Sequence, residues 1–492
     1  MRGRVYLVGA GPGDPGLITV RGLDVLRQAD VILYDHLAPV SLLEHARPDA
    51  ERIYVGKKRA DHHLSQDETN ALLVEKAQAG AVVVRLKGGD PFIFGRGGEE
   101  GEALHAAGIR FEVVPGVSSA TGAAAYAGIP LTHRSRTSAI SFVTGHEVDA
   151  IDWAKVGQTE TLVIFMGLTT FGDIAERLIA GGREPNTPAA AIRWGTRPDQ
   201  RTVIGTVANL AERIARAQLK PPALIIVGEV VALREDLNWF EKLPLFGQRI
   251  VLTRAGEQAG ESAEQLWRLG ADVVPAPTIE IREPSSWAPI DAAIANLETY
   301  DWLIFTSRNG VERFLARLDA SERDLRAVKG RIAAIGPATA EALSEARLKT
   351  DCLPGEFVAE GLLEALDSDL TGKKILIARA EVAREILPEG LRERGASVDV
   401  APVYRTAVPD SSALREALAA KRPDWITFTS SSTVRHFVEM AGEEALQGVR
   451  IASIGPVTSA TIRGHGVEPT VEADPHTMEG LIAAIAGRVR PG

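Results

Sequence analysis

Cysteine is almost absent from this sequence, with Cys352 the single thiol among 492 residues. One cysteine excludes an internal disulfide and a multi-cysteine metal site, so we expect no bound metal and a reducing compartment. Long apolar runs are also missing, since none approaches the ~18 residues that cross a bilayer, and no secretory signal opens the chain. We therefore expect a cytoplasmic protein with no membrane partner.

Net positive charge is lacking as well, because the formal net charge is −10. An acidic chain is unsuited to broad nucleic-acid binding, so we expect no nucleic-acid partner. The balance leaves room for a local basic pocket around an acidic small molecule. The remaining composition, 45% hydrophobic and 24% charged, is typical of globular domains.

Short runs rich in valine, isoleucine and leucine alternate with amphipathic stretches of helical length. This alternation predicts an α/β fold whose sheets are covered on both faces. The predicted strands are Val5–Val8, Val31–Tyr34, Val82–Leu86, Leu162–Phe165, Leu224–Val227, Ile250–Thr253, Leu303–Thr306, Ile375–Ala378 and Ile426–Thr429. Pro244 and Gly247 interrupt "EKLPLFGQRIVLTR", so we place the major domain boundary near 243–248.

The second half of the chain contains an internal repeat. "DWLIFTSRNGVERF" from Asp301 returns as "DWITFTSSSTVRHF" from Asp424, and "RIAAIGPATAEAL" from Arg331 returns as "RIASIGPVTSATI" from Arg450. "IVLTRA" is likewise echoed by "ILIARA". A spacing of roughly 120 residues is too long for a solenoid and predicts two similar α/β domains.

A glycine-rich loop, "VGAGPGDPGLIT", lies near the start and matches G-x-G-x-x-G, with Asp35 placed like the ribose-binding acid of a dinucleotide fold. Pro12 and Pro15 lack the N–H groups that a pyrophosphate loop donates. Thr19 is expected to cap a helix from about Val20, well after the glycines. A nicotinamide-dependent oxidoreductase stays open as an alternative, as does a tight connection without a ligand.

A second glycine-rich loop, "RLKGGDPFIFGRGGEE" from Arg85, follows a predicted strand and precedes a helix. Gly88 and Gly89 permit a positive φ and a close approach of the backbone to a ligand. Loops at the carboxyl ends of parallel strands are common ligand sites. We expect a binding loop here, with a plain glycine-rich turn as the alternative.

The motifs "VGAGPGDPGLIT", "YDHL", "VGKK…HHLSQDETN", "RLKGGDPFIFGRGGEE", "PGVSSATGAAAYAGIPLTHR", "FMGL" and "WGT" occur in this order. Together they resemble the uroporphyrinogen-III C-methyltransferases of the tetrapyrrole (precorrin) methyltransferase family, over residues 1–246. The resemblance implies two α/β subdomains, about 1–115 and 116–246, with S-adenosylmethionine bound in the cleft between them. It also implies a homodimer formed through this half.

The same resemblance implies the site residues. Asp35 would be the proton acceptor and Lys57 the proton donor, although a turn aspartate and a solvated basic loop are the plainer alternatives. The implied cofactor-binding residues are Pro12, Gly88, Gly89, Asp90, Ile93, Ser118, Ser119, Met166 and Gly195. Because S-adenosylmethionine has no phosphate, a loop that contains prolines is compatible with it.

The implied substrate, uroporphyrinogen III, carries several carboxylates and requires cations around it. The candidate counter-ions are Arg85, Lys57, Lys58, Arg59, His62, His63 and Arg134. Arg85 is the substrate-binding residue that we single out. Its replacement by alanine is expected to raise the KM for the porphyrinogen more than that for the cofactor.

The motifs "FTSRNGVE", "AIGPATA", "VYRT" and "FTSSSTV…SIGPVTS" resemble the uroporphyrinogen-III synthase family, over residues 247–492. The resemblance implies two flavodoxin-like domains, the first formed by about 247–280 plus 405–488 and the second inserted at about 281–404. It also implies closure of hydroxymethylbilane to uroporphyrinogen III, with ring inversion, loss of water and no cofactor.

Tyr404 of "VYRT" is the implied proton donor to the leaving hydroxyl, with an ordinary linker aromatic as the alternative. The implied hydrogen-bonding residues of this half are Thr306, Ser307, Thr339, Ser430 and Thr458, all of which could instead cap helices. The whole chain is thus predicted to make uroporphyrinogen III and methylate it to precorrin-2, in the sirohaem or cobalamin branch. A non-catalytic tetrapyrrole-sensing second half is the alternative.

Overall fold

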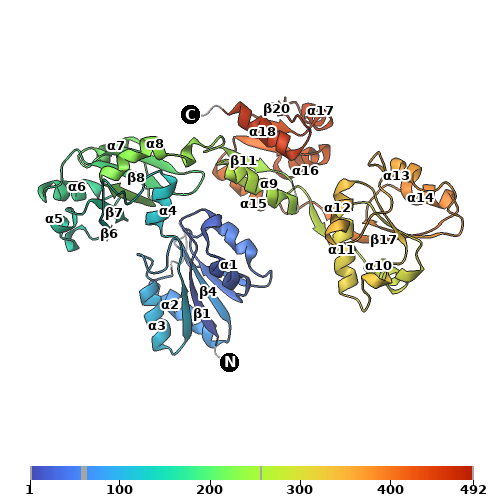
Figure 1. The fold of residues 1–492 in the computed structure, drawn as a ribbon, viewed down its shortest axis with the longest axis horizontal. Coiled ribbons are helices and arrows are strands. Elements are labelled where there is room, and N and C mark those ends of the chain that lie inside the picture. The colour runs from blue at the N-terminus through green and yellow to red at the C-terminus, as the bar shows by residue number, and fades with distance from the viewer. Residues whose placement is uncertain (1–2, 57–63, 255–256, 490–492) are drawn as a thin grey trace. The chain divides into compact units, whose positions relative to one another are not determined.

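A computed structural model describes residues 3–56, 64–254 and 257–489. Within these residues the chain forms four five-stranded sheets flanked by helices, which confirms the predicted α/β class (Figure 1). All nine predicted strands coincide with observed strands to within two residues at each end. The chain divides into two compact units at Arg249/Ile250, with residues 265–273 and those after 485 grouped with the first unit.

The first sheet is parallel throughout, in the order β3-β2-β4-β1-β5. Its elements are β1 (Arg4–Gly9), α1 (Val20–Arg27), β2 (Val31–Tyr34), β3 (Glu51–Tyr54), α2 (Gln66–Gln78), β4 (Val82–Lys87), α3 (Gly97–Ala106) and β5 (Arg110–Val114). α1 covers one face, and α2 and α3 cover the other (Figure 1). Because the strands run in one direction, the loops that follow them meet at one edge.

The second sheet is mixed, in the order β6-β7-β10-β8-β9, with β10 antiparallel to both of its neighbours. Its elements are α4 (Ser119–Tyr126), β6 (Ile140–Thr144), α5 (Trp153–Val156), β7 (Thr161–Phe165), α6 (Phe171–Ala180), β8 (Pro188–Arg193), β9 (Arg201–Thr206), α7 (Leu210–Arg216), β10 (Ala223–Val227) and α8 (Arg234–Leu237). The alanines of α4 pack on one face, and α6 and α7 cover the other.

The second unit holds the other two sheets, in the orders β12-β11-β18-β19-β20 and β13-β17-β16-β14-β15. The strands are β11 (Arg249–Leu252), β12 (Asp272–Pro275), β13 (Glu280–Arg282), β14 (Trp302–Phe305), β15 (Arg331–Ala334), β16 (Lys374–Ala380), β17 (Ser397–Ala407), β18 (Trp425–Phe428), β19 (Arg450–Ser453) and β20 (Val471–Glu472). β13 pairs antiparallel with the end of β17. The domain boundaries at 280/281 and 404/405 stay a prediction.

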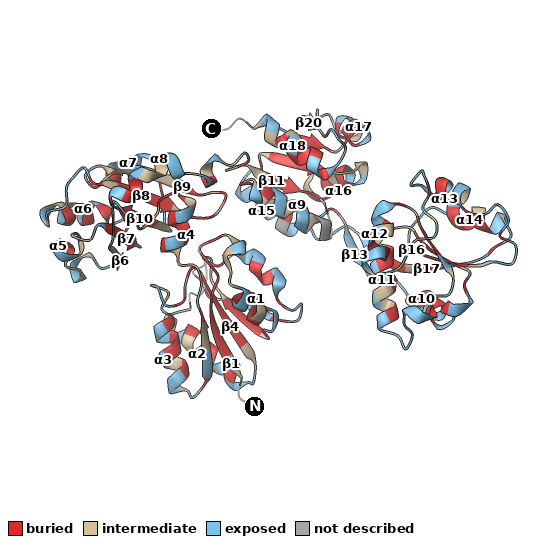
Figure 2. Ribbon diagram, viewed as in Figure 1, coloured by how far each residue is buried: buried red, intermediate tan, exposed pale blue. Residues whose placement is uncertain are grey.

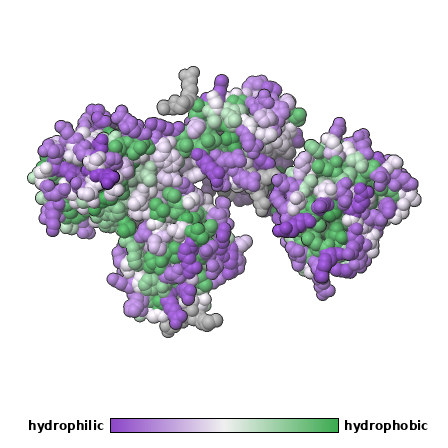
Figure 3. Space-filling model, viewed as in Figure 1, coloured by the Kyte–Doolittle hydropathy of each residue, from purple (hydrophilic) through white to green (hydrophobic). Residues whose placement is uncertain are grey.

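Helices cover these sheets, and Figure 2 shows buried strands inside helices with exposed outer faces. They are α9 (Glu257–Arg268), α10 (Ala288–Ala295), α11 (Arg308–Asp319), α12 (Pro337–Glu345), α13 (Ala359–Ala365), α14 (Ile386–Glu393), α15 (Ser412–Ala420), α16 (Ser431–Ala441), α17 (Pro456–Gly464) and α18 (Met478–Arg488). No helix in the described part of the chain is long and apolar enough to cross a membrane. The visible surface mixes hydrophilic and hydrophobic residues (Figure 3).

Candidate active site

A cavity of about 480 Å³ lies in the first unit, where loops of the first sheet meet loops of the second. Its lining contains most of the residues predicted for this half: Pro12, Asp35, Arg85, Gly88, Gly89, Ile93, Ser119, Met166 and Gly195. Arg85 lies on β4, and the others come from loops after β1, β2, β4, β7 and β8 and from the start of α4. The fold therefore brings together positions that the sequence spreads over more than 180 residues.

The two glycine-rich loops are joined by backbone hydrogen bonds. The Gly89 N–H donates to the Gly11 carbonyl over 2.7 Å, and the Gly11 N–H donates to the Gly89 carbonyl over 3.3 Å. Gly11 and Gly89 have φ values of +77° and +69°, a region that favours glycine. The contact holds both loops against the cavity through the backbone alone.

The first loop has few N–H groups left for a pyrophosphate. The Asp14 N–H donates to Thr196 Oγ1 over 2.9 Å and the Gly16 N–H donates to Asp14 Oδ1 over 2.8 Å. Pro12 and Pro15 have no N–H, and Gly11 is bonded to Gly89. The helix that follows begins at Val20 with Thr19 as its N-cap, which confirms the predicted capping.

Asp90 and Ser118 are outside the cavity lining and accept hydrogen bonds from the backbone, and their role at the cofactor stays a prediction. Asp90 accepts from the Phe92 N–H over 2.8 Å and from the Gly116 N–H over 3.0 Å. Ser118 is the N-cap of α4 and accepts from the Ala120 N–H over 3.3 Å. Both side chains fix the loops that carry the lining residues Gly89 and Ser119.

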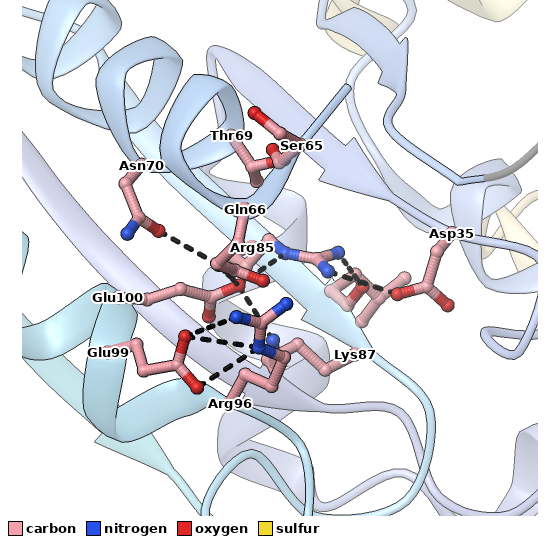
Figure 4. Close-up of polar contacts among 11 residues, drawn as sticks. Asp35, Ser65, Gln66, Thr69, Asn70, Arg85, Lys87, Arg96, Glu99 and Glu100 are labelled. Carbon is pink, nitrogen blue, oxygen red and sulfur yellow. Dashed lines mark hydrogen bonds and ion pairs between the residues drawn. The ribbon is translucent and has the colours of Figure 1, made fainter. Parts of the chain in front are cut away.

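A buried cluster of charged side chains lies beside the cavity (Figure 4). Arg85 and Lys87 are two residues apart on β4 and therefore point to the same face of the sheet. Glu100 Oε1 on α3 accepts from Lys87 Nζ over 2.7 Å and from Arg85 Nε over 3.1 Å. Arg85 Nη2 donates to Asp35 Oδ2 over 3.0 Å. One guanidinium thus bridges two carboxylates.

Burial sets the electrostatics of this cluster. Glu100 is 0% exposed, and Lys87 and Arg85 are 4% and 6% exposed. Burial lowers the pKa of the Lys87 ammonium below its ordinary value, the Arg85 charge lowers it further, and Glu100 acts in the opposite direction. The carboxylate of Glu100 is therefore what makes two adjacent buried cations compatible.

Strained backbone also surrounds the cavity. Phe94, Arg96, Met166 and Trp194 have φ values of +51°, +59°, +54° and +49°, and all four line it. A left-handed conformation at a non-glycine residue costs roughly 1 kcal/mol or more and persists where the surrounding structure imposes it. Such strain is typical of ligand sites.

Of the other predicted cations of the first half, Arg134 alone lies among the described residues. Lys57, Lys58, Arg59, His62 and His63 lie outside the described residues. Arg134 is exposed and is not in the cavity lining.

No site role was assigned to Lys87, Glu100 or Trp194 from the sequence. The signal for the first two was available, because alternating cations on a buried strand require an acid from the covering helix. The ring of Trp194 lies 4.2 Å from the Arg197 guanidinium carbon. Trp194 is the first residue of the motif "WGT", whose Gly195 was expected at the cofactor, and this neighbour was the available signal.

In the second unit, Tyr404 lies on β17 and is 7% exposed. Its hydroxyl is 3.0 Å from Ser307 Oγ. Ser307 also caps α11 by accepting from the Gly310 N–H over 3.0 Å. Two of the predicted residues of this half are therefore in direct contact, and the capping alternative holds for Ser307 as well.

The remaining predicted residues of this half are spread over both of its sheets. Ser430 caps α16, and Ser430 and Thr458 line a second cavity near the N-termini of α16, α17 and α18. Thr458 is 4% exposed, and Thr339, at the corresponding place in α12, is 3% exposed. Thr306 is half-buried after β14. Thr306, Ser307, Thr339 and Tyr404 do not line the second cavity.

No group of three or more histidine, cysteine, aspartate or glutamate side chains suited to a metal ion was found within residues 3–56, 64–254 and 257–489.

Two family models match the chain. The model for tetrapyrrole (corrin/porphyrin) methylases matches residues 4–211, and the model for uroporphyrinogen-III synthase HemD matches residues 260–483.

Similar proteins match one or both halves. Porphyrin biosynthesis protein HemD of Ruminiclostridium josui is 37% identical over 492 residues, which is 98% of this chain and 97% of that protein. Uroporphyrinogen-III C-methyltransferase of Bacillus subtilis is 42% identical over 339 residues, 68% of this chain and 69% of that protein. A crystal structure of uroporphyrin-III C-methyl transferase from Thermus thermophilus, complexed with S-adenyl homocysteine, is 42% identical with a TM-score of 0.42, covering 47% of this chain and 100% of that one. The chain belongs to the family of porphyrin-biosynthesis proteins that join a tetrapyrrole methylase half to a uroporphyrinogen-III synthase half.

Proposed function

We propose that the chain is a bifunctional enzyme of tetrapyrrole biosynthesis. Its second half closes hydroxymethylbilane to uroporphyrinogen III, and its first half transfers two methyl groups from S-adenosylmethionine to that product, giving precorrin-2. The observation that carries the proposal is the cavity of the first unit, where residues from Pro12 to Gly195 converge in a chain of this family.

The cavity suits an adenosine and amino-acid ligand without phosphate. Gly88 and Gly89 let the backbone approach closely, and the first loop has few free N–H donors for a pyrophosphate. When bound, S-adenosylmethionine supplies an electrophilic methyl group. The protein's own part is to hold a carbon of the substrate in line with that group and to exclude water.

Asp35 is the proposed proton acceptor of the methylation. Its carboxylate lies in the cavity lining with one oxygen held by Arg85, so it is oriented beside the substrate space. The lining also contains Lys87 and Arg96, groups that match the carboxylates of a porphyrinogen. Lys57 is kept as the proposed proton donor.

Tyr404 is the proposed proton donor to the leaving hydroxyl in the second half. Loss of hydroxide from an electron-rich hydroxymethylpyrrole is intrinsically easy, so the protein mainly folds the linear substrate toward one ring closure. The contact between Tyr404 and Ser307 orients the phenol.

We further propose that the enzyme works in the cytoplasm, as a homodimer through its first half.

Mass spectrometry of the products formed from hydroxymethylbilane, with and without S-adenosylmethionine, tests the proposal. Without S-adenosylmethionine we expect uroporphyrinogen III alone. With S-adenosylmethionine we expect a product that is heavier by two methyl groups. A product that carries no added methyl group contradicts the assignment of the first half.

The alternatives predict different results in the same samples. A non-catalytic sensing module leaves spontaneous ring closure, which gives isomer I, so the isomer ratio measured without the methyl donor decides between sensor and synthase. A nicotinamide-dependent oxidoreductase binds NADH. We instead expect calorimetry on this protein to detect binding of S-adenosylhomocysteine and no binding of NADH.

A further inference from the structure

The guanidinium of Arg85 is held by protein acceptors on all three of its nitrogens. Nε donates to Glu100 Oε1 over 3.1 Å, Nη1 to the Leu86 carbonyl over 3.0 Å, and Nη2 to Asp35 Oδ2 over 3.0 Å. The side chain is only 8% exposed. A planar fork fixed in this way presents a set orientation to Asp35 and has little freedom to follow a substrate carboxylate.

Glu100 determines where that fork lies. It is fully buried on α3, and its Oε1 accepts from Arg85, from Lys87 and, over 3.4 Å, from Gln66 Nε2 of α2 (Figure 4). Without this carboxylate, Arg85 and Lys87 would be two adjacent buried cations with no shared acceptor. Repulsion between them would then push Arg85 away from its present place.

Asp35 depends on Arg85 for its own orientation. It follows β2 in a loop, where its Oδ1 accepts from the Leu37 N–H over 3.0 Å and its Oδ2 from Arg85. The Leu37 contact is local, since the two residues are two apart in the chain. The Arg85 contact ties it to a central strand of the sheet.

We propose that Glu100 is a positioning residue for methyl transfer, which fixes Arg85 and through it the Asp35 carboxylate at the cavity. This inference rests on the proposed function of Asp35 as proton acceptor. It assigns Arg85 to Asp35 and not to a substrate carboxylate, so it replaces the role expected for Arg85 from the sequence. Displacement of a reacting group by about 1 Å can cost about 100-fold in rate.

The test is the steady-state kinetics of Glu100→Gln in the full chain, with labelled S-adenosylmethionine and uroporphyrinogen III. We expect kcat for methyl transfer to fall by about 100-fold, with the KM for the porphyrinogen and the dissociation constant of S-adenosylhomocysteine within about twofold of the wild type. Glu100→Asp keeps the charge and is expected to recover part of the rate. Glu102→Gln, an exposed acid on the same helix, is the matched control and keeps full activity.

A double-mutant cycle shows whether Glu100 acts through Asp35. In an Asp35→Asn background, Glu100→Gln is expected to lower the residual rate by no more than about twofold, because the group that it positions is already inactive. If Glu100→Gln does not bind S-adenosylhomocysteine, Arg85→Lys replaces it in the cycle, since a lysine keeps the cation but cannot bridge both carboxylates.

Two results overturn the inference, and they differ from failure of the proposed function. A rise in the KM for the porphyrinogen at constant kcat makes the cluster a substrate-binding site. Independent, multiplicative losses in the double variant show that Glu100 does not act through Asp35. Full activity of Asp35→Asn instead removes the proposed role of Asp35, and absence of methylation by the wild type removes the proposed function.

Discussion

At the scale of single residues, Gly89 shows why a sequence of glycines could be interpreted as a ligand loop. Its φ of +69° and its backbone pairing with Gly11 are both observed, and a Cβ there would lie 3.2 Å from Ser119 Oγ. Gly89→Ala is therefore expected to cost about 1–2 kcal/mol of backbone strain. We expect a roughly tenfold weaker affinity for S-adenosylhomocysteine, measured by calorimetry.

Gly98→Ala is the control for that substitution. Gly98 lies in α3, has no positive φ, and a Cβ there meets nothing within 4 Å. Alanine is expected to leave affinity unchanged and to raise the free energy of unfolding by up to about 1 kcal/mol. Equal loss of affinity in both variants would contradict a role of the Gly89 conformation in binding.

Tyr404 offers a second residue-level prediction, in the other half. Tyr404→Phe removes the hydroxyl that lies 3.0 Å from Ser307 Oγ and is expected to slow cyclisation by about 100-fold while the fold persists. The measurement is the yield of isomer III from hydroxymethylbilane over time.

Tyr300→Phe is its matched control, because Tyr300 is also buried and donates to Asp399 over 2.6 Å. Its loss is expected to lower stability by about 1–2 kcal/mol without an effect on cyclisation. Similar rates for both variants would remove Tyr404 from the chemistry.

Residues whose role depends on the local backbone or on neighbours in the sequence could be predicted. Buried hydrogen-bond partners that are distant in the sequence could not. Thr19 was identified as a cap because an N-cap is determined by neighbours within three residues. Glu100 was not identified, because its importance comes from Arg85 and Lys87 on a strand that only the folded sheet brings near α3. The hydrogen bond between Asp90 and Gly116 was not predicted either, because that partner is likewise set by tertiary structure, and the role of Asp90 at the cofactor stays a prediction.

At the scale of elements, the first loop is tied to α4 by one hydrogen bond between side chains. The Tyr126 hydroxyl donates to Asp14 Oδ2 over 2.6 Å. Burial and the Asp14 carboxylate both raise the pKa of Tyr126 above its ordinary value. The bond is therefore a link between two elements that responds to alkaline pH.

Its pH dependence follows from the direction of that shift. A phenol whose pKa is raised by folding contributes its full stability below about pH 10, the value in the unfolded chain, and loses it as the pH rises toward the folded value. Tyr126→Phe is expected to lower the free energy of unfolding by about 1–2 kcal/mol at pH 7.5, and by progressively less above pH 10. Denaturant unfolding of both proteins at several pH values measures this difference. A constant difference across the range would show that ionisation of Tyr126 is not involved.

The repeated strands of the second half could be predicted because similar sequence segments occur twice in it. Trp302 pairs with Ile375 in one sheet, and Trp425 pairs with Ile250 in the other. Arg331 stacks on Trp302 at 4.3 Å, and Arg450 stacks on Trp425 at 4.6 Å. The mixed direction of the second sheet was not predicted, because a buried antiparallel strand such as Ala223–Val227 is as uniformly apolar as a parallel one.

At the scale of the whole molecule, each half builds its candidate site from its own residues. The lining of the first cavity extends from Pro12 to Leu224, and that of the second from Arg254 to Glu479. Neither lining includes a residue of the other half. This division of the lining residues favours two sites that work independently in one chain.

The two activities are consequently expected to be separable by single substitutions in the full chain. Asp35→Asn should leave only a residual rate of methylation and keep the rate of isomer III formation within about twofold of the wild type. Tyr404→Phe should slow isomer III formation and keep the methylation of added uroporphyrinogen III within about twofold of the wild type. An equimolar mixture of the two variants should then make precorrin-2 from hydroxymethylbilane after a lag that shortens with protein concentration, because the intermediate has to diffuse between chains. Loss of both activities in either variant, or no product from the mixture, would show that the halves depend on each other.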